Sequence, residues 1–163
     1  MARRKIIIET IGTIYTPFKK IKGMPIQPVA AEGVKGHIEI FPEYAKGLED
    51  LEEFSHITLL YHFHEINGYN LKVKPFMDDE EHGIFATRSP KRPNAIGIST
   101  VELLNIENNI LYIASTDMLN ETPLIDIKPF FGIFDNRFDT RSGWLDKNSD
   151  LSGNKLLSDN RFL

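Results

Sequence analysis

One stretch carries most of the chemistry of this chain: Gly83-Ile84-Phe85-Ala86-Thr87-Arg88-Ser89-Pro90-Lys91-Arg92-Pro93-Asn94-Ala95-Ile96-Gly97-Ile98-Ser99. A short apolar strand is predicted over residues 84–86 and a second begins at Ala95, with a turn of two prolines and three cations between them. Each proline fixes its own φ and restricts the residue before it to extended conformations. The loop therefore loses little entropy on ordering, which suits it to hold side chains ready for a ligand.

The three cations of this loop predict a site for an anionic group. Arg88 and Arg92 carry planar guanidinium forks that match a carboxylate or a phosphate, and Lys91 is a mobile point charge. Asn94 adds a short-range polar contact. The alternative is a solvated hairpin tip, whose charges keep the edge of a sheet from pairing with other molecules. The loop residues by themselves favour neither interpretation.

Length and composition predict one ordinary globular domain. The chain has 163 residues and a formal net charge of −4, which argues against sequence-independent coating of nucleic acid but permits a local basic patch. The absence of cysteine excludes disulfides and thiolate zinc sites. No apolar run approaches the roughly 20 residues that span a bilayer, and the apolar residues 6–8 are too few for a signal peptide. We therefore expect a cytoplasmic protein without a membrane partner.

Turn residues divide the chain into short extended segments, which predicts a mainly β fold. Strands are expected over residues 5–15, 36–41, 55–64, 71–76, 96–104, 110–118 and 124–129, and the best helix candidate is 43–54. This pattern favours a β-barrel or a β-sandwich with one or two short helices. Residues 18–31 form a long polar connection, a type of segment that is usually functional or mobile. Beyond Phe134 the pattern dissolves, so we expect a loosely packed or arm-like tail.

Several other residues allow both a functional and a structural interpretation. His62 and His64 share one strand face, but zinc needs further ligands, so ordinary strand histidines are favoured over a metal site. Asp126 and Lys128 also share a face, which favours a structural ion pair for Lys128. Asp117 and Asp126 are candidate proton acceptors if they line a cleft. Core packing or a subunit contact is favoured over base stacking for four aromatic residues: Phe130, Phe131, Phe134 and Phe138.

The central stretch resembles the signature of a known family. Its residues Phe85-Ala86-Thr87-Arg88-Ser89-Pro90-x-Arg92-Pro93-Asn94-x-Ile96-Gly97-x-Ser99 are similar to the motif of the TsaA-like family, the TrmO-type β-barrel tRNA methyltransferases. Four further segments share the resemblance: Ile11-Gly12 with Thr16-Pro17-Phe18, Pro25-x-Gln27-Pro28, Gly47-Leu48-Glu49 to Phe54-Ser55-His56, and Thr122-Pro123-Leu124-x-Asp126-Ile127-Lys128-Pro129. The resemblance thus covers about residues 9–145.

This resemblance implies an S-adenosylmethionine-dependent enzyme that methylates N6 of the threonylcarbamoyl-modified adenosine beside the anticodon of tRNA. It implies a small antiparallel β-barrel and a homodimer with the cofactor near the subunit interface. We expect the barrel domain over residues 1–140 and an irregular C-terminal tail over 141–163. The cofactor-contacting residues that it carries over are Gln27, Pro28, Val29, His64, Glu65, Arg88, Ile98, Glu121, Thr122, Pro123 and Leu124.

Elementary chemistry agrees with part of that cofactor set. Arg88 suits the carboxylate at the methionine end of the cofactor, and apolar residues such as Ile98 and Leu124 suit its adenine ring. Oxygen atoms would suit the positive sulfonium centre. Two positions depart from the family pattern, because Val29 stands where glycine is frequent and Asn120-Glu121 stands where Asp-Gly is frequent. Both departures change the conformational freedom of the backbone at an expected cofactor contact.

RNA recognition is the remaining expectation. The candidate substrate-binding residues are Lys91, Arg92 and Asn94. A local basic patch for an anticodon loop is expected from six cations: Arg88, Lys91 and Arg92 of the loop, with Lys19, Lys20 and Lys22 of the connection. A solvated loop is the alternative for the three lysines of the connection. Two other functions remain open: a methyltransferase with a different small acceptor, and a non-enzymatic sensor that binds adenosylmethionine and signals through a partner.

Overall fold

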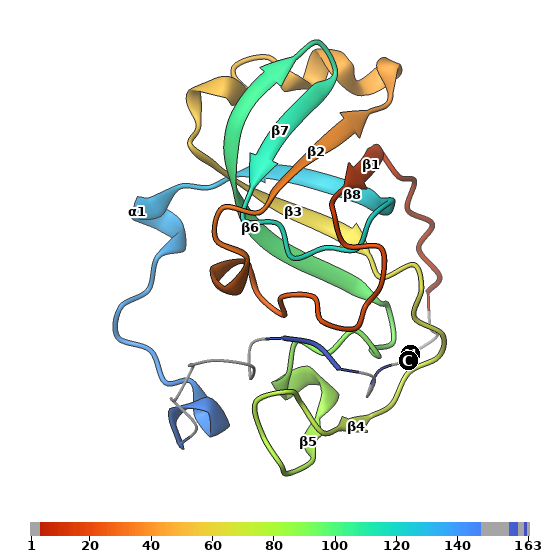
Figure 1. Cartoon of the computed structure of the whole chain (residues 1–163), viewed down its shortest axis with the longest axis vertical. Helices are drawn as coiled ribbons and strands as arrows, with labels where there is room; N and C mark the ends of the chain where they lie inside the picture. Colours follow the sequence, from red (N-terminus) through yellow and green to blue (C-terminus); the bar gives the residue numbers. More distant parts are fainter. Residues whose placement is uncertain (1–3, 148–156, 160–161, 163) are drawn as a thin grey trace.

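The computed structural model describes residues 4–147, 157–159 and 162. Within these residues six antiparallel strands close into a barrel in the order β1-β2-β7-β6-β3-β8, and two short strands, β4 and β5, form a separate ribbon (Figure 1). The predicted mainly β fold is confirmed, and its architecture is a barrel rather than a sandwich. No helix in this part of the chain combines the length and the apolar character that a membrane span requires.

Except for the 12-residue strand β6, the elements have eight residues or fewer. The barrel strands are β1 (Gly12–Tyr15), β2 (Lys35–Ile40), β3 (His56–His62), β6 (Ile96–Glu107), β7 (Ile110–Ala114) and β8 (Thr122–Pro129), and the ribbon strands are β4 (Lys72–Val73) and β5 (His82–Gly83). Five 3-10 helices and one turn of α-helix are described: η1 (Pro28–Ala31), η2 (Pro42–Leu48), η3 (Leu51–Glu53), η4 (Ile84–Ala86), α1 (Gly132–Asp135) and η5 (Gly143–Lys147).

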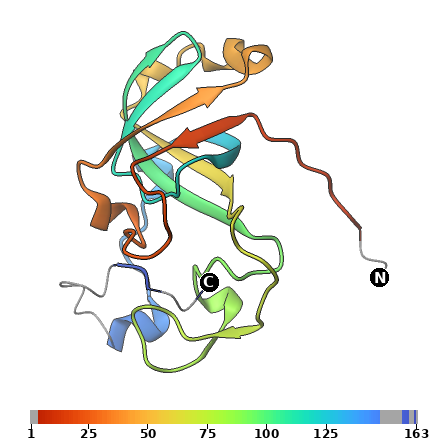
Figure 2. The same cartoon turned by 45° about the vertical axis from the view of Figure 1, so that its right-hand side comes forward.

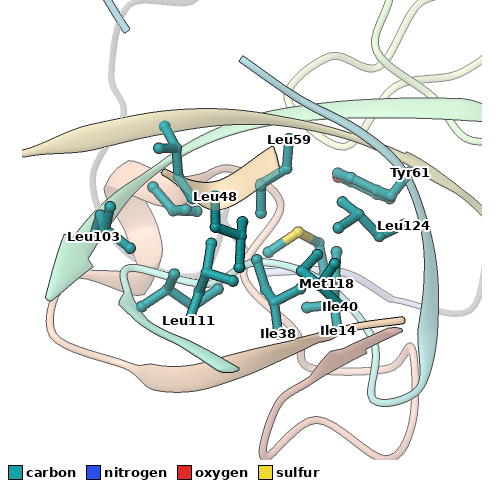
Figure 3. Packing of buried hydrophobic residues seen from close by; sticks show 13 residues of the cluster. Ile14, Ile38, Ile40, Leu48, Leu59, Tyr61, Leu103, Leu111, Met118 and Leu124 are labelled. Carbon is teal, nitrogen blue, oxygen red and sulfur yellow. The ribbon is translucent and has the colours of Figure 1, made fainter. Parts of the chain in front are cut away.

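Alternate side chains of the barrel strands point inward and fill the barrel. On β3, Ile57, Leu59 and Tyr61 are buried while their neighbours are more exposed, because successive side chains of a strand point to opposite faces. Figure 3 shows how these inward-facing side chains pack into one apolar cluster. Leu48 joins that cluster from η2, which lies with η3 at the upper end of the barrel in Figure 1.

The barrel closes where β1 pairs with both β2 and β8. Gly12 stands opposite Ile40 on one side and Leu124 on the other. The strands approach closely there, since a Cβ atom added to Gly12 would lie 2.4 Å from the carbonyl oxygen of Glu39. The absence of a side chain at this position is therefore a condition for closing the barrel.

The predicted helix over 43–54 is wrong in type. The chain forms two 3-10 helices instead, η2 and η3, separated by Asp50 in the left-handed conformation with φ of +66°. The break turns the chain so that Leu48 and Leu51 both pack against the barrel cluster. Helical spacing alone does not reveal such a break, because tertiary packing overrides local propensity.

The strand predicted over residues 84–86 is also wrong, because these residues form the 3-10 helix η4. The Thr87 hydroxyl donates a hydrogen bond of 2.9 Å to the Ile84 carbonyl, and the Thr87 N–H donates to the same oxygen at 3.2 Å. A threonine that bonds to the backbone in this way stabilises a turn at the expense of a strand.

Three other predicted strands are shorter than expected. The strand predicted over 5–15 is limited to β1, and residues 4–10 extend away from the barrel (Figure 2). The strand predicted over 71–76 is limited to the two residues of β4. The strand predicted over 110–118 ends at Ala114, because Ser115 turns the chain with φ of +62°.

The predicted aromatic core contacts near residue 130 are largely wrong. Phe131, Phe134 and Phe138 have exposed fractions of 42%, 63% and 90%. Phe131 forms edge-to-face pairs with Phe54 at 5.5 Å and with Phe134 at 5.9 Å. The other prediction for these residues, a subunit contact, stays a prediction.

We predict that Gly12→Ala destabilises the fold, because its methyl group would collide with a strand carbonyl that has little room to move. The expected loss is about 1–3 kcal/mol in the free energy of unfolding, measured by denaturant titration. Gly47→Ala is the matched control, since a Cβ atom there meets nothing within 4 Å. Equal stability of the two variants would contradict this account of barrel closure.

Candidate functional site

A cavity of about 1060 Å³ lies between the barrel and the segment that carries β4, β5 and η4. In Figure 1 this is the region below the barrel, where the ends of β3 and β6 meet the loops. Its wall is built from segments far apart in the sequence, which lie within residues 21–29, 61–66, 75–77, 85–98, 117–122 and 142–146, with Ser158 and Phe162. The predicted binding loop therefore forms one wall of a real cavity.

The structure brings most of the predicted site residues to this cavity. Those that line it are Gln27, Val29, His64, Glu65, Arg88, Ile98 and Thr122 of the cofactor set, Arg92 of the substrate set, and Asp117. Those that do not line it, in the described part of the chain, are Pro28, Glu121, Pro123, Leu124, Lys91, Asn94 and Asp126.

Three of the predicted site residues that do not line the cavity have identifiable structural environments. The side chain of Leu124 is fully buried in the barrel core, where it faces away from solvent. Asp126 forms the predicted ion pair with Lys128, with Nζ to Oδ2 at 2.8 Å. Glu121 has φ of +61°, so the turn does require the left-handed conformation that glycine adopts most easily.

Arg88 connects two parts of the cavity wall. Its Nη1 donates a hydrogen bond of 3.0 Å to Oε1 of Gln27, which joins the central loop to the connection over residues 18–31. The two residues were expected in the same site, and they are 61 positions apart in the chain. The Arg88 guanidinium also acts on the carboxyl of Asp117, whose charged form it favours. A fixed positive group of this kind suits an anionic part of a ligand.

Unlike Arg88, Arg92 forms hydrogen bonds within its own loop. Its Nη1 donates to the carbonyl oxygens of Thr87 and Ser89, at 3.0 and 3.3 Å. These bonds brace the central loop across its tightest part, so the guanidinium is committed to the protein backbone. Ser89 Oγ is buried in the same loop and has no hydrogen-bond partner within the described residues.

Three side chains form a hydrogen-bond relay beside the cavity. Ser99 Oγ donates to Oδ1 of Asp117 at 2.7 Å, and the hydroxyl groups of Tyr61 and Ser99 are 3.0 Å apart. Because the single hydroxyl proton of Ser99 is used on Asp117, Tyr61 donates to Ser99. The relay therefore runs from Tyr61 on β3, through Ser99 on β6, to Asp117 in the turn before β8.

Burial shifts the pKa values of two members of this relay, Asp117 and Tyr61. Burial raises the pKa of Asp117 to about 6, and the Ser99 hydrogen bond and the Arg88 charge oppose that rise in part. The pKa of Tyr61 is also raised, first by burial and then by the charge of Asp117, so its phenol keeps its proton. Perturbed groups that line a cavity indicate a functional site.

Gly97 makes room for the relay. It pairs with Tyr61 across β3 and β6, and a Cβ atom at Gly97 would lie 2.3 Å from Cε2 of the tyrosine ring. The ring therefore occupies the space that a side chain at Gly97 would take. Phe63 packs edge-to-face on the same ring at 5.4 Å and fixes its orientation.

The turn that carries Asp117 is held from both sides. The Thr16 hydroxyl donates to the carbonyl of Met118 at 2.8 Å, and the Thr16 N–H donates to Oδ1 of Asn120 at 3.1 Å. The Thr122 hydroxyl donates to the carbonyl of Leu119 at 2.7 Å. These bonds anchor the turn to β8 and to the residue that follows β1, so the carboxyl has a defined position.

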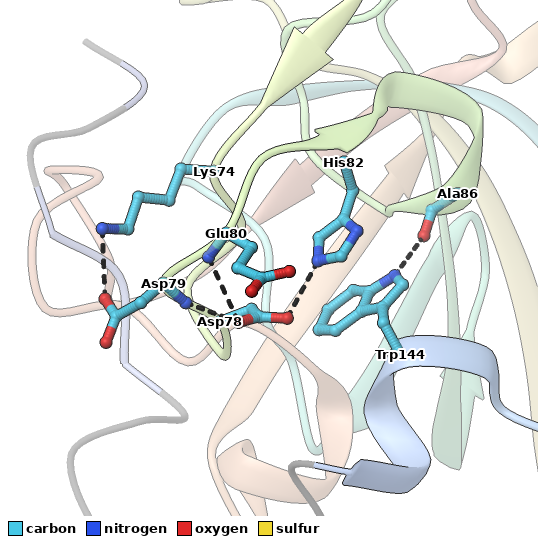
Figure 4. Close-up of polar contacts among 7 residues, drawn as sticks. All are labelled: Lys74, Asp78, Asp79, Glu80, His82, Ala86 and Trp144. Atoms are coloured by element: carbon cyan, nitrogen blue, oxygen red, sulfur yellow. Dashed lines mark hydrogen bonds and ion pairs between the residues drawn. The ribbon is translucent and has the colours of Figure 1, made fainter.

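The C-terminal part of the chain closes another side of the cavity. Trp144 Nε1 donates to the carbonyl of Ala86 at 2.9 Å, and its ring stacks on His82 at 4.7 Å (Figure 4). His82 Nε2 lies 2.8 Å from Oδ2 of Asp78, and this hydrogen bond lowers the pKa of Asp78. Phe162 is buried, so the described parts of the predicted tail pack against the body rather than forming an arm. Residues 148–156, 160–161 and 163 of that tail lie outside the described residues.

Sequence reasoning missed Tyr61, Ser99 and Trp144 as site residues. Alternation correctly placed Tyr61 on the buried face of β3, but no pattern shows that its hydroxyl reaches Ser99 on another strand. Trp144 was visible only as an isolated aromatic residue in a polar segment. Within the described residues there is no group of three or more His, Cys, Asp or Glu side chains that would hold a metal ion.

We predict that Asp117→Asn stabilises the fold at about pH 8. The pKa of Asp117 in the folded protein, about 6, exceeds its ordinary value of 3.8, so folding favours the protonated form. This contribution is present in full below about pH 4 and is lost as the pH rises through about 6. The uncharged variant avoids that loss, with an expected gain of up to about 3 kcal/mol at pH 8 that shrinks towards pH 4.

The measurement is the free energy of unfolding as a function of pH for both proteins. Asp126→Asn is the control, because it removes another carboxylate but breaks an exposed ion pair, whose contribution is about 0–1 kcal/mol. A loss of stability in Asp117→Asn that is independent of pH would contradict the assigned burial of the Asp117 charge.

The relatives of this chain agree with the resemblance in its sequence. The family model described as the tRNA-methyltransferase O N-terminal domain matches residues 13–136. A probable S-adenosyl-L-methionine-binding protein of Pyrococcus abyssi is 52% identical over 157 residues, which is 96% of this chain and 85% of that protein. A tRNA (adenine(37)-N6)-methyltransferase of Mus musculus is 35% identical over 138 residues, which is 80% of this chain and 32% of the mouse protein.

Solved structures give the same result. The crystal structure of TrmO from Pseudomonas aeruginosa matches with a TM-score of 0.73 and 34% sequence identity, covering 86% of this chain and 63% of that chain. This chain therefore spans less than two thirds of the TrmO chain and about a third of the mouse enzyme. With the family model matching most of its length, the chain belongs to the tRNA-methyltransferase O N-terminal domain family, as its central motif predicts.

Proposed function

We propose that this protein is an S-adenosylmethionine-dependent methyltransferase that modifies N6 of the threonylcarbamoyl-modified adenosine next to the anticodon of tRNA. The observation that carries the proposal is the Arg88–Gln27 hydrogen bond, which fixes a guanidinium group in the wall of a large cavity. Related proteins are named for S-adenosylmethionine binding and for tRNA adenine-N6 methylation, which supports both the cofactor and the reaction.

The cavity suggests how the cofactor is held. The methionine carboxylate pairs with Arg88, and the adenine ring lies against Ile98, whose side chain is 53% exposed on β6. Thr122, His64 and Glu65 supply polar groups from two other walls. Leu124 takes no part in this arrangement, because its side chain is inside the barrel and the residue does not line the cavity.

The size of the cavity supports an acceptor in the same space. Pockets for a single drug-sized ligand measure roughly 300–1000 Å³, so a cavity of about 1060 Å³ takes the cofactor and part of a nucleoside. Methyl transfer then needs mainly the alignment of the acceptor nitrogen, the methyl carbon and the sulfur, which a braced loop supplies.

The rim of the cavity suits the RNA backbone. Lys20 and Lys22 flank Ile21, which lines the cavity, and Lys91 follows the lining residue Pro90. An anticodon loop that places its modified adenosine in the cavity would bring phosphates close to these cations. Asn94, which is exposed at the end of the central loop, adds a polar contact for the RNA. A tRNA substrate also favours a cytoplasmic location.

A homodimer is part of the proposal. Ile133, Phe134 and Phe138 are exposed to 85%, 63% and 90%, and exposed apolar groups of this kind mark contact surfaces. We place the subunit contact on this segment, and light scattering of the purified protein measures the mass in solution.

A sensor is the second candidate, and one observation favours it. The Pyrococcus relative, which covers 96% of this chain, is named only for binding S-adenosyl-L-methionine. A sensor would bind the cofactor in the same cavity and transfer nothing. A methyltransferase with a different small acceptor would transfer the methyl group, but not to tRNA.

We predict that Arg88→Ala weakens the binding of S-adenosylmethionine by about 10- to 100-fold, because a charged hydrogen-bond partner of the cofactor carboxylate is lost. Isothermal titration calorimetry measures the dissociation constant. Arg141→Ala is the matched control, since Arg141 is exposed and does not line the cavity. If Arg88→Ala and Arg141→Ala bind the cofactor equally well, the assigned position of the carboxylate is wrong.

The reaction is tested by incubating the protein with methyl-labelled S-adenosylmethionine and tRNA. We expect label in tRNA that carries the threonylcarbamoyl modification and none in tRNA that lacks it, with the product nucleoside identified by mass spectrometry. Tight cofactor binding without transfer to any RNA would favour the sensor. Transfer to unmodified tRNA would overturn the assigned substrate and leave the methyltransferase activity in place.

A further inference from the structure

We propose that Asp117, held in position by Ser99 and Tyr61, accepts the proton that the acceptor nitrogen releases during methyl transfer. This inference rests on the proposed function and assigns a role that the family resemblance does not provide. It begins from geometry: the turn before β8 places a carboxyl group at the same cavity as Arg88. Asp126, the other carboxylate that the sequence offers for this role, is paired with Lys128 and does not line the cavity.

The relay leaves the carboxylate able to take up a proton. A carboxylate has about four lone-pair sites, and the Ser99 hydroxyl occupies one of them at 2.7 Å. The hydrogen bonds that hold the turn over residues 115–121 fix where the remaining sites point. A proton acceptor must have this kind of defined position within reach of its donor.

The chemical step balances with these groups. The lone pair of the acceptor nitrogen attacks the methyl carbon, the N–C bond forms, and the C–S bond breaks with its electron pair going to sulfur. The sulfonium charge is thereby neutralised, and the nitrogen passes its N–H proton to the carboxylate of Asp117. The products are the methylated nucleoside, S-adenosylhomocysteine and the protonated carboxyl group, which returns its proton to solvent.

The surroundings of the carboxyl group suit this task. Its pKa of about 6 leaves it ionised at neutral pH, yet makes it a better proton acceptor than an ordinary aspartate. Arg88 and Ser99 favour the ionised form, while burial disfavours it. Among the described residues, the other titratable or charged groups on the cavity wall are Tyr61, His64, Glu65, Arg92 and Asp146. A charge kept at such a place at the expense of stability is typical of a functional group.

Ser99 and Tyr61 are positioning residues in this account. Ser99 orients the carboxyl through its hydroxyl, and Tyr61 fixes the rotation of that hydroxyl by donating to its oxygen. Gly97 provides the space for the tyrosine ring. None of the three needs to touch the substrate for its substitution to affect the rate.

The decisive experiment compares Asp117→Asn with the natural protein. We expect the rate of methyl transfer at saturating cofactor to fall by about 100-fold or more, while the dissociation constant of S-adenosylmethionine stays unchanged. Transfer at an unaltered rate would overturn the inference and leave the proposed function intact. A large loss of cofactor affinity would also overturn it, because Asp117 would then be a cofactor ligand. If the natural protein transfers nothing, the proposed function and the inference fall together.

The positioning role has a separate readout in the pH profile of the rate. For the natural protein we expect the rate to rise with pH through about 6, as Asp117 loses its proton. The Ser99 hydrogen bond lowers the pKa of Asp117, so Ser99→Ala shifts the midpoint of the profile to higher pH. A merely structural role of Ser99 would lower the rate equally at every pH and would contradict the inference.

Thr100→Ala is the matched control for Ser99→Ala. Thr100 is the next residue on β6, and its hydroxyl lies 2.9 Å from that of Thr58, so its substitution also removes a hydroxyl pair between β3 and β6. Thr100 does not line the cavity, and its variant should keep the pH midpoint of the natural protein. An equal shift in both variants would show that the effect is a general consequence of altering the strand.

Discussion

The antiparallel register of β3 and β6 is the constraint on which the site depends. It sets Tyr61 opposite Gly97 and Leu59 opposite Ser99, so the tyrosine ring fills the place of the absent side chain. From there its hydroxyl reaches Ser99, and Ser99 reaches Asp117 in the turn before β8. A shift of one residue in this register would move all of these side chains to the other face of the barrel. The same strand pairing that completes the barrel therefore also positions the polar groups at the cavity.

Two arginines of the central loop, which joins η4 to β6, have different roles. Arg92 donates to the carbonyl oxygens of the loop and makes it rigid, while Arg88 reaches across to Gln27 and presents charge to the cavity. The prolines restrict the backbone in the unfolded chain as well, so less entropy is lost when the loop orders. Rigid loops around a large cavity suit a reaction that depends on alignment more than on strong chemical assistance.

Much of this arrangement was predictable, because it follows from patterns of residues that are close together in the sequence. The alternation of apolar residues predicts the strands of the barrel, and the two prolines and three cations predict a stiff, positively charged loop. The relay was not predictable, because Tyr61 and Ser99 are 38 residues apart and Ser99 and Asp117 are 18 apart. Such contacts depend on strand register and turn geometry. The different tasks of Arg88 and Arg92 were hidden for the same reason, and so was the wall formed by Trp144.

The central claim is that one cavity holds the methyl donor between Arg88 and Asp117. A crystal structure of the protein with S-adenosylhomocysteine tests it most directly. The account predicts that the carboxylate of the ligand lies within hydrogen-bond distance of the Arg88 guanidinium and that its sulfur faces the side of the cavity with Asp117. A ligand bound outside this cavity, or one inside it with Arg88 turned away from the carboxylate, would contradict the account.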